Sequence, residues 1–253
     1  MFAEERLNQI LDILKRDGRV FVKDLSARFN VSEAMIRKDL QRLEREGKLK
    51  RTYGGAILER KKAESTSIDA RLIKNMDIKL KIAEKAYEQL EDMDIIFLDI
   101  SSINYLIAKL VASRDKKITI VTNMVEITSL FTKNIYTSLI CIGGVYNKML
   151  GGVVGSAAIE SISKHRYDKA FIGSCGVNIY DCSISNFDLE EGNTKKAIIK
   201  ASKKVYLVME NEKFFFDGSY RFANLKDADF IITEDRPEEK IIEFLEKNNI
   251  GII

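Results

Sequence analysis

The chain has 253 residues, enough for one or two domains. Hydrophobic residues make up 45% of it and charged residues 31%, with 1 proline and 14 glycines, so the composition excludes disordered, collagen-like and low-complexity proteins. The opening residues, MFAEERLNQIL, contain no apolar stretch typical of a secretory signal, and no apolar run approaches the roughly 18 residues of a membrane span. We therefore expect a soluble, cytoplasmic protein that does not engage a membrane.

The cysteines and the histidine predict neither disulfides nor metal. Cys141, Cys175 and Cys182 are odd in number and lack CxxC spacing, which favours reduced thiols. His165 is the single histidine, and nothing near it has the spacing of zinc ligands. We expect no bound metal and no resident cofactor.

Charge is unevenly distributed along the chain. Residues 1–62 hold 16 Lys and Arg against 10 Asp and Glu, a net charge of +6, while the remaining residues hold 25 against 28, a net charge of −3. A basic end joined to a slightly acidic remainder is typical of a nucleic-acid-binding domain attached to a second domain.

The first fifty residues have the pattern of a helix-turn-helix. A first helix ends at Gly18, and its apolar residues recur at helical spacing: Leu7, Ile10, Leu11 and Leu14. A short helix is predicted over Lys23–Phe29, and a longer one over about Glu33–Glu46. Between them, Asn30 suits a left-handed turn and Ser32 suits the N-cap of the longer helix. Short helix, turn and longer helix form this motif.

The longer helix has one apolar and one polar face. At 100° per residue, Ile36, Leu40 and Leu43 form a narrow stripe toward the other helices. Arg37 lies on the flank. The opposite face carries Met35, Lys38, Gln41, Arg42 and Arg45. Arginine and lysine bind guanine edges and phosphates in the major groove, although the face of any amphipathic helix is often charged.

The segment Lys48–Leu58 favours DNA binding over an ordinary charged surface. It has the pattern of two short basic strands around a Gly-Gly turn, which is the β-wing of a winged helix. A wing of this kind lies along the DNA backbone or enters the minor groove.

The run from Val20 to Ala56 resembles the winged helix of the DeoR family of bacterial transcriptional regulators. The resemblance rests on "VSEAMIRKDLQRLEREGKLKRTYGGA": the VS start, the IRKDL core, the LE..G.L.R segment and the terminal GGA at fixed spacing. It implies sequence-specific binding to double-stranded operator DNA, with the helix after Ser32 as the recognition helix. The candidate DNA contacts are Ser32, Glu33, Met35, Arg37, Lys38, Gln41, Arg42, Arg51, Tyr53 and Gly54.

The pattern defines three parts: a winged helix-turn-helix domain over 1–58, a polar connector over 59–75 and an α/β domain over 76–253. In the third part, predicted strands alternate with helices. The strands are Asp94–Asp99, Lys117–Thr122, Thr137–Gly143, Asp168–Gly173, Lys204–Met209 and Asp229–Thr233; the helices include Lys79–Leu90, Tyr105–Ala112 and Thr194–Lys203. Such alternation predicts a mostly parallel, Rossmann-like sheet covered on both faces.

Glycines, hydroxyls and one lysine follow the predicted strands, where ligands of parallel sheets bind. Asp99, Ser101 and Ser102 follow the first strand, and Asn123 follows the second. The third ends at Gly143-Gly144, the fourth at Gly173, and the fifth leads to Lys213. Each feature alone is as well explained by a turn, a cap or a solvated side chain, but together they favour a small-molecule pocket able to bind phosphate.

The DeoR resemblance extends over nearly the whole chain. Its further signatures are Arg71, the helix with Lys79, "FLDISSI", "VTN", "GGV", "DKAFIG", the Glu191…Lys195 pair and "EKF". It implies a ribose-5-phosphate-isomerase-like domain that senses phosphorylated sugars. The candidate effector contacts are Asp99, Ser101, Ser102, Asn123, Gly144, Gly173, Glu191, Lys195 and Lys213.

One loop departs from the family pattern. The usual aspartate–X–Gly–Thr/Ser–Thr is here Asp99-Ile100-Ser101-Ser102-Ile103. Serine in place of glycine restricts close approach of the backbone to an anion, and Ile103 removes a hydroxyl donor.

Two hypotheses of different classes follow. The leading one is a transcriptional regulator, which we expect to be a repressor of a carbohydrate operon controlled by a phosphorylated sugar. We expect it to bind a palindromic operator as a homodimer or homotetramer. The alternative is a sugar-phosphate isomerase with an appended DNA-binding domain, in which Asp99 or Glu191 would be the general base and Lys213 the electrophile. We predict that the chain is not an enzyme, with no catalytic residues.

Overall fold

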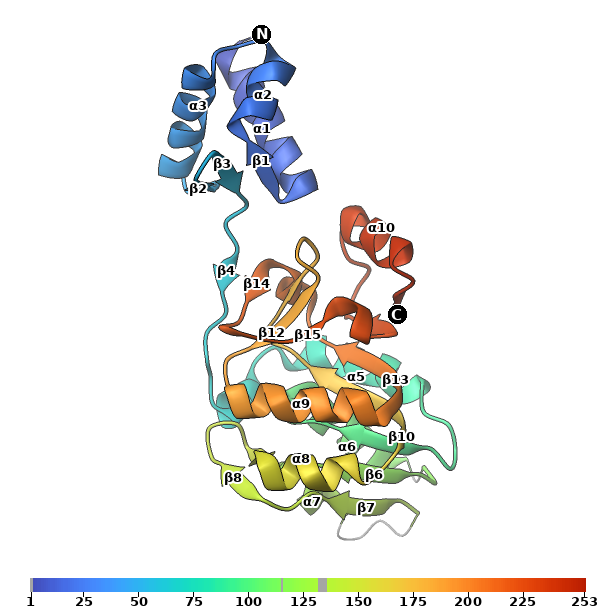
Figure 1. Ribbon diagram of the computed structural model, residues 1–253. Coiled ribbons are helices and arrows are strands. Elements are labelled where there is room, and N and C mark those ends of the chain that lie inside the picture. Colours follow the sequence, from blue (N-terminus) through green and yellow to red (C-terminus); the bar gives the residue numbers. More distant parts are fainter. Residues whose placement is uncertain (1, 115, 132–135) are drawn as a thin grey trace. The chain divides into compact units, whose positions relative to one another are not determined.

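The computed structural model describes residues 2–114, 116–131 and 136–253 (Figure 1). The chain divides into two compact units, Met1–Lys61 and Lys62–Ile253. Each unit has a hydrophobic core of its own.

The first unit is a winged helix. Its elements are α1 (Ala3–Asp17), β1 (Arg19–Phe21), α2 (Val22–Phe29), α3 (Glu33–Arg45), β2 (Lys50–Thr52) and β3 (Gly55–Ile57). The local signals act as predicted: Gly18 ends α1 with φ 72° and Asn30 ends α2 with φ 51°. Ser32 caps α3, because its hydroxyl accepts a hydrogen bond from the backbone N–H of Met35 at 3.3 Å.

The core of this unit confirms the predicted apolar stripe. Ile36, Leu40 and Leu43 of α3 are buried with the apolar residues of α1 and α2. The strand β1 was not predicted. It pairs with β3, giving the sheet order β1-β3-β2, and the close approach at Gly55 explains the glycine: a Cβ there would lie 2.0 Å from the carbonyl oxygen of Val20.

The second unit is built on seven parallel strands in the order β17-β16-β13-β10-β5-β6-β7. The strands are β5 (Ile95–Leu98), β6 (Thr119–Thr122), β7 (Ser138–Cys141), β10 (Tyr167–Gly173), β13 (Ser202–Val208), β16 (Phe230–Ile232) and β17 (Gly251–Ile252). The predicted α/β class with a parallel sheet is therefore confirmed.

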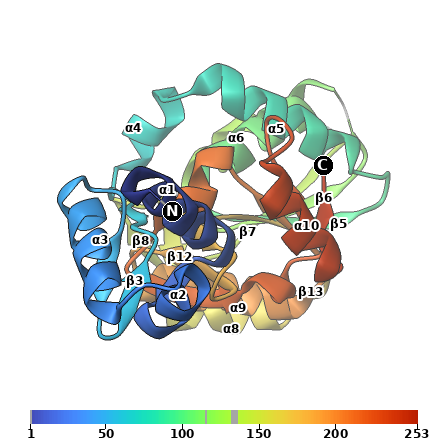
Figure 2. The ribbon, with the colours of Figure 1, turned by 90° about the horizontal axis from the view of Figure 1, so that it is seen from above.

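Helices cover both faces of the sheet. They are α4 (Ile68–Ile73), α5 (Met76–Glu88), α6 (Ser102–Ser113), α7 (Val125–Thr128), α8 (Ser156–Ser163), α9 (Leu189–Ala201) and α10 (Glu239–Lys247), with short 3₁₀ turns at η1 (Ser129–Phe131), η2 (Asn211–Phe215) and η3 (Leu225–Asp227). Figure 2 shows α5 and α6 on one side of the strands and α8 and α9 on the other.

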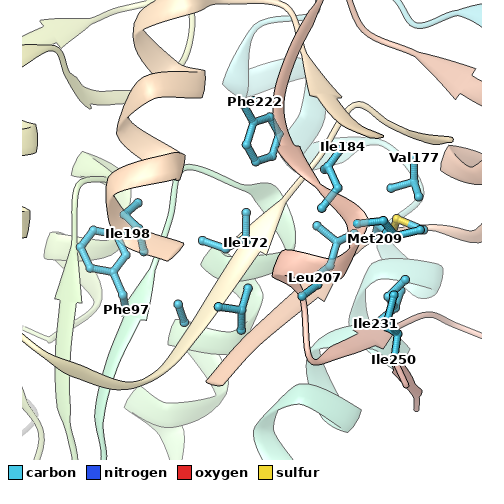
Figure 3. Packing of buried hydrophobic residues seen from close by; sticks show 14 of the residues in the cluster. Phe97, Ile172, Val177, Ile184, Ile198, Leu207, Met209, Phe222, Ile231 and Ile250 are labelled. Carbon is cyan, nitrogen blue, oxygen red and sulfur yellow. The ribbon is translucent and has the colours of Figure 1, made fainter. Parts of the chain in front are cut away.

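Alternating strand residues divide the core into two clusters. Phe97 and Ile172 face α9 with Ile198, as Figure 3 shows, while their neighbours Leu98 and Phe171 face the cluster of α5 and α6. This alternation follows from the period of two along a strand. A strand buried on both faces has a continuous apolar sequence, which is why these strands were found from sequence.

Antiparallel strands join the parallel sheet at its carboxyl-end loops. They are the hairpin β8 (Val145–Asn147) and β9 (Gly152–Val154), and a sheet of β11 (Gly176–Asn178), β12 (Ser183–Asn186) and β15 (Tyr220–Asn224); β14 (Phe216–Asp217) lies nearby in the chain. None of these was predicted, nor were α8 and α10. Helix α9 begins at Leu189 rather than at Thr194, since Asp188 caps it through the N–H of Glu191 at 2.8 Å.

The segment expected to be a connector, 59–75, is partly ordered in the structure. It contains β4 (Lys61–Lys62) and α4, and Ile68 of α4 is only 2% exposed, packed in the core of the second unit. The N–H of Ile68 donates to the carbonyl of Met149 at 3.2 Å. A single apolar turn among charged residues lacks a helical period, so only tertiary packing reveals it.

The order of the strands determines where a ligand site would lie. From β5 the chain proceeds through β6 to β7 on one side, and from β10 through β13, β16 and β17 on the other. The order therefore reverses between β5 and β10. In open parallel sheets, ligands bind at the carboxyl ends of the strands at such a switch point.

Candidate functional site

Helix α3 presents a polar face with several side chains that make no ion pair. Lys38, Gln41 and Arg45 are exposed and have no salt-bridge partner among the described residues. Met35 is 44% exposed on the same helix. These residues lie on the face predicted to meet DNA.

Other candidate contacts on this unit are already paired. Arg37 bonds Glu33 at 2.5 Å, one helical turn away, and Arg42 bonds Glu4 at 2.7 Å. The guanidinium of Arg51 lies 3.1 Å from Glu44. Exposed pairs of this kind are weak, so phosphates can replace the carboxylates at little cost in free energy.

The wing ends in a fully exposed aromatic side chain. Tyr53 and Gly54 form the turn between β2 and β3, and Gly54 has φ 81°, which favours glycine. Nothing covers the ring of Tyr53 within its unit, where its exposed fraction is 107%. The turn thus lies one residue before the predicted Gly-Gly position, because Gly55 belongs to β3.

The second candidate site lies at the switch point, around Asp99. This carboxylate follows β5 and is 1% exposed. It accepts hydrogen bonds from the side chain of Asn104 at 2.6 Å, from the backbone N–H of Gly173 at 3.1 Å and from the ammonium of Lys195. The carboxyl ends of the adjacent strands β5 and β10 meet α9 here.

Glu191 completes a buried charged triad with Asp99 and Lys195. Its carboxylate lies 3.3 Å from the Lys195 ammonium and accepts a bond from Asn186 at 3.1 Å. Burial alone would lower the pKa of Lys195, but the two carboxylates raise it above the usual value. Lys195 therefore keeps its charge at neutral pH.

The remaining loop residues after β5 support this triad. Ser101 caps α6, its hydroxyl accepting from the N–H of Ile103 at 3.2 Å, and a Cβ on Gly173 would lie 2.8 Å from the Cβ of Ser101. Ser102 is buried in the first turn of α6. Serine in place of the family's glycine thus supplies the helix cap and packs against the end of β10.

Three other predicted residues lie in neighbouring loops. The side-chain amide of Asn123 donates to the carbonyl of Val153 at 2.9 Å, and its side-chain oxygen Oδ1 is buried without a hydrogen-bond partner among the described residues. A Cβ on Gly144 would lie 2.9 Å from Cγ1 of Val153, and none of the described contacts joins Gly144 to Asp99. Lys213 lies 3.0 Å from Glu212.

Lys79 lies near a group of cations, Arg71, Lys74 and Lys213, of which only Lys213 was among the predicted contacts. Lys79 is 4% exposed, and its ammonium donates to the carbonyl of Arg71 at 2.5 Å. Burial lowers the pKa of Lys79, and the nearby cations Lys213, Arg71 and Lys74 lower it further against the opposing effect of Glu210. Arg71 and Lys79 are among the signatures of the DeoR resemblance, but only the tertiary structure shows that they converge.

Cys175 lies close enough to this cation group and to the Asp99–Glu191–Lys195 triad for charges of both to act on its thiol. Burial raises the pKa of the Cys175 thiol to about 11, and the charges that act on it are Glu191, Lys195, Arg71 and Lys213. The guanidinium of Arg71 donates to the carbonyl of Leu150 at 2.9 Å, while its Nε is buried without a partner. The site thus combines several cations with unsatisfied polar atoms, as expected where an anion binds.

Within the described part of the chain, no group of three or more His, Cys, Asp or Glu side chains is arranged to hold a metal ion. The helices described there include none both long enough and apolar enough to cross a membrane.

A helix-turn-helix joined to a parallel α/β domain with a charged interior defines a two-domain DNA-binding regulator. Family comparison agrees: residues 6–62 match the DeoR-like helix-turn-helix domain, and residues 74–235 match the DeoR C terminal sensor domain. The chain belongs to the DeoR family of transcriptional regulators.

Curated relatives align over the whole chain. An uncharacterized HTH-type transcriptional regulator, FruR, of Bacillus subtilis (strain 168) is 33% identical, covering 100% of this chain and 99% of its own. The HTH-type transcriptional repressor GlcR of the same organism is 29% identical (100% and 96%). The glycerol-3-phosphate regulon repressor of Escherichia coli (strain K12) is 28% identical (100% and 99%).

Proposed function

We propose that this chain is a transcriptional repressor of a carbohydrate operon whose affinity for operator DNA is set by a phosphorylated sugar. The observation that carries the effector part is the buried Lys79 among other cations, beside an Arg71 Nε that has no partner. An anion bound there would satisfy both groups. Acting on DNA, the protein would work in the cytoplasm.

For DNA binding, α3 offers Lys38 and Gln41 without competing ion pairs, and Arg37 with one weak pair. These side chain types bond purine edges and phosphates in the major groove. The exposed Tyr53 at the wing tip would contact the backbone or the minor groove. Two copies would read the two halves of a palindrome, so the functional form is a homodimer or a homotetramer.

For effector binding, the phosphate would lie against Arg71, Lys79 and Lys213. A dianionic phosphate suits a cluster of cations with few carboxylates. One relative is named a glycerol-3-phosphate regulon repressor and another a lactose phosphotransferase system repressor, which supports a phosphorylated sugar or polyol here.

The arrangement around Asp99 favours a regulator over an isomerase. Both oxygens of Asp99 accept bonds from protein donors, and Glu191 is bonded by Lys195 and Asn186. A general base needs a free lone pair within reach of the substrate proton. The bonds to Asp99 thus come from protein donors on both oxygens, and we assign to Asp99 and Glu191 the role of holding the buried Lys195 in place.

Helix α4 is the proposed route from effector to DNA-binding unit. Arg71 belongs to α4, its backbone carbonyl accepts from Lys79, and its side chain holds Leu150. The first compact unit ends at Lys61, and α4 begins a few residues later, at Ile68. In this proposal α4 has two positions, one for each level of operator affinity. An effector that binds Arg71 more tightly in one position shifts operator affinity by up to that difference in binding free energy.

Fluorescence-anisotropy titration tests the proposal, with DNA from upstream of the chain's own operon and a scrambled duplex across a salt series. We expect the upstream DNA to bind on the order of 10³ tighter at every salt concentration. Lys38→Ala and Arg37→Ala should each cost about 1–3 kcal/mol if they contact bases. Asp12→Ala, an exposed change on α1, is the control.

The effector arm adds hexose, pentose and triose phosphates, each beside its unphosphorylated counterpart. A shift in operator affinity with a phosphorylated compound alone, abolished by Arg71→Ala, is the expected result. Equal binding to both duplexes contradicts the operator part; unchanged operator affinity with every phosphate contradicts the effector part. Turnover of any of these compounds would instead favour the isomerase.

A further inference from the structure

The parallel sheet ends at β7 in a strand whose outer edge has no pairing partner among the described residues. The backbone N–H of Ser138 donates to Ile118 at 3.0 Å, and that of Ile142 donates to Thr122 at 2.8 Å. Backbone groups alternate in direction along a strand, so those of Leu139 and Cys141 point away from β6. They form a short template for another strand.

This edge lacks charge and proline, two of the features that normally prevent pairing between molecules. Residues 136–147 include no charged residue and no proline. Charges, proline, bulges or very short strands are the usual protections. The opposite edge of the same sheet has one of them, because β17 is only 2 residues long.

Exposed apolar side chains continue along the same segment. Ile140 is 38% exposed on β7 itself, and Cys141 next to it is exposed as well. Further exposed apolar residues precede or follow the strand in the sequence: Tyr136 at 53%, and Val145, Tyr146 and Met149 of the next hairpin at 73%, 48% and 56%. Single exposed apolar residues are common, but apolar side chains on an open, uncharged edge strand are typical of an interface.

We propose that β7 is a homodimer interface, in which it pairs antiparallel with β7 of a second copy and the two sheets become one. A two-fold axis turns a strand into its own antiparallel neighbour, so the surface must match itself. This edge does so: its backbone groups are self-complementary, and no like charges along residues 136–147 would repel each other.

The directions of the amide groups fix the allowed register. With the axis beside Ile140, the outward groups of Leu139 meet those of Cys141 of the partner subunit, forming an antiparallel hydrogen-bonded pair on each side of the axis. Ile140 then faces Ile140 of the partner subunit in a non-hydrogen-bonded pair, with Cα atoms about 4.5 Å apart. The exposed side chain of Ile140 then lies at the centre of the interface.

Sedimentation velocity on the full chain tests the interface, with Ile140→Lys and a matched control, Leu80→Lys. Leu80 lies on α5 with a similar exposed fraction, 40% against 38%. A lysine at the axis would face its own copy, so Ile140→Lys should weaken association on the order of 100-fold and halve the mass of the assembly, while Leu80→Lys leaves it unchanged. An unchanged mass for Ile140→Lys, or a monomeric native chain, overturns the proposal.

Cross-linking provides a second test that does not depend on the folding of the lysine variant. In a Cys141→Ser background, Ile140→Cys should form a covalent dimer on mild oxidation, because non-hydrogen-bonded antiparallel pairs lie within disulfide reach. Leu80→Cys in the same background should remain monomeric on a non-reducing gel. No more cross-linking by Ile140→Cys than by Leu80→Cys would exclude this pairing, and a covalent link to a different protein would assign the edge to another partner.

Discussion

Two buried lysines in the sensor unit have opposite electrostatic surroundings. Lys195 lies against Asp99 and Glu191, whose carboxylates raise its pKa despite burial. Lys79 donates to a carbonyl oxygen and has Lys213 and Arg71 as neighbours; burial and these cations lower its pKa against the opposing effect of Glu210. A buried ammonium among cations is costly unless an anion completes the site. Two carboxylates thus balance the charge of Lys195 within the fold. The cations that act on Lys79 outnumber the one opposing carboxylate, Glu210, so a bound anion would balance its charge.

Effector binding should therefore depend on the protonation of Lys79. Because the charged form binds the phosphate, affinity should fall as pH rises through the lowered pKa of Lys79, below the usual value of about 10.4. Lys79→Met should weaken binding by about 1.5–3 kcal/mol at neutral pH and remove this loss at high pH. Isothermal titration calorimetry from pH 7 to 10 measures both effects.

Lys81→Met is the control, since Lys81 lies on the same helix with a side chain 59% exposed. It should keep the affinity and pH profile of the native chain. The same pH profile in Lys79→Met and the native chain would show that Lys79 does not bind the effector.

At the scale of elements, the winged helix is held together by a buried ion pair. Arg6 of α1 bonds Asp39 of α3 at 2.6 Å and 3.2 Å, with side chains 7% and 12% exposed. The sequence predicted both helices but not the pair, because Arg6 and Asp39 lie 33 residues apart and only the packing of α1 against α3 brings them together. Its hydrogen bond raises the pKa of Arg6, so Arg6 remains charged.

Asp39→Ala should destabilise the first unit by about 3–5 kcal/mol, because it leaves an unpaired guanidinium buried between the helices. Urea denaturation followed by circular dichroism measures the change, with Asp12→Ala on the exposed face of α1 as the matched control. Asp12→Ala should stay within about 0.5 kcal/mol of the native chain. Equal stability of the two variants would show that the pair contributes little.

At the scale of the whole molecule, the chain has separate cores. One cluster lies wholly within residues 7–58, and the other clusters lie wholly within residues 68–253. The smaller unit buries a modest number of apolar side chains, and small domains are the less stable ones. The two units are therefore expected to unfold independently.

Thermal and urea unfolding should show two transitions, the first from the winged helix. Hydrogen exchange with mass spectrometry assigns each transition, because amides of α1 to α3 should lose protection before those of the parallel sheet. Asp39→Ala should shift the first transition and leave the second unchanged. A single transition with equal calorimetric and van't Hoff enthalpies would contradict independent units.

Elements with an apolar run of their own are predictable from the sequence. Six of the seven parallel strands were found, because each contains such a run, and β17 was missed because it is only 2 residues long. The antiparallel strands β8 and β12 were missed, because their sequences, VYN and SISN, contain no apolar run of this kind. The stripe of Ile36, Leu40 and Leu43 was predicted in full from a period of 3.6.

By itself the sequence determined what depends on neighbours along the chain: the caps at Gly18, Asn30 and Ser32, the two faces of α3, the parallel strands and the family. Tertiary structure alone decided which distant side chains meet. It placed Lys195 on Asp99, a separation of 96 residues, and brought Arg71, Lys79 and Lys213 to one place. Local backbone preferences act over a few residues and leave a pattern, whereas electrostatic and packing contacts between distant segments leave none until the sheet order brings the segments together.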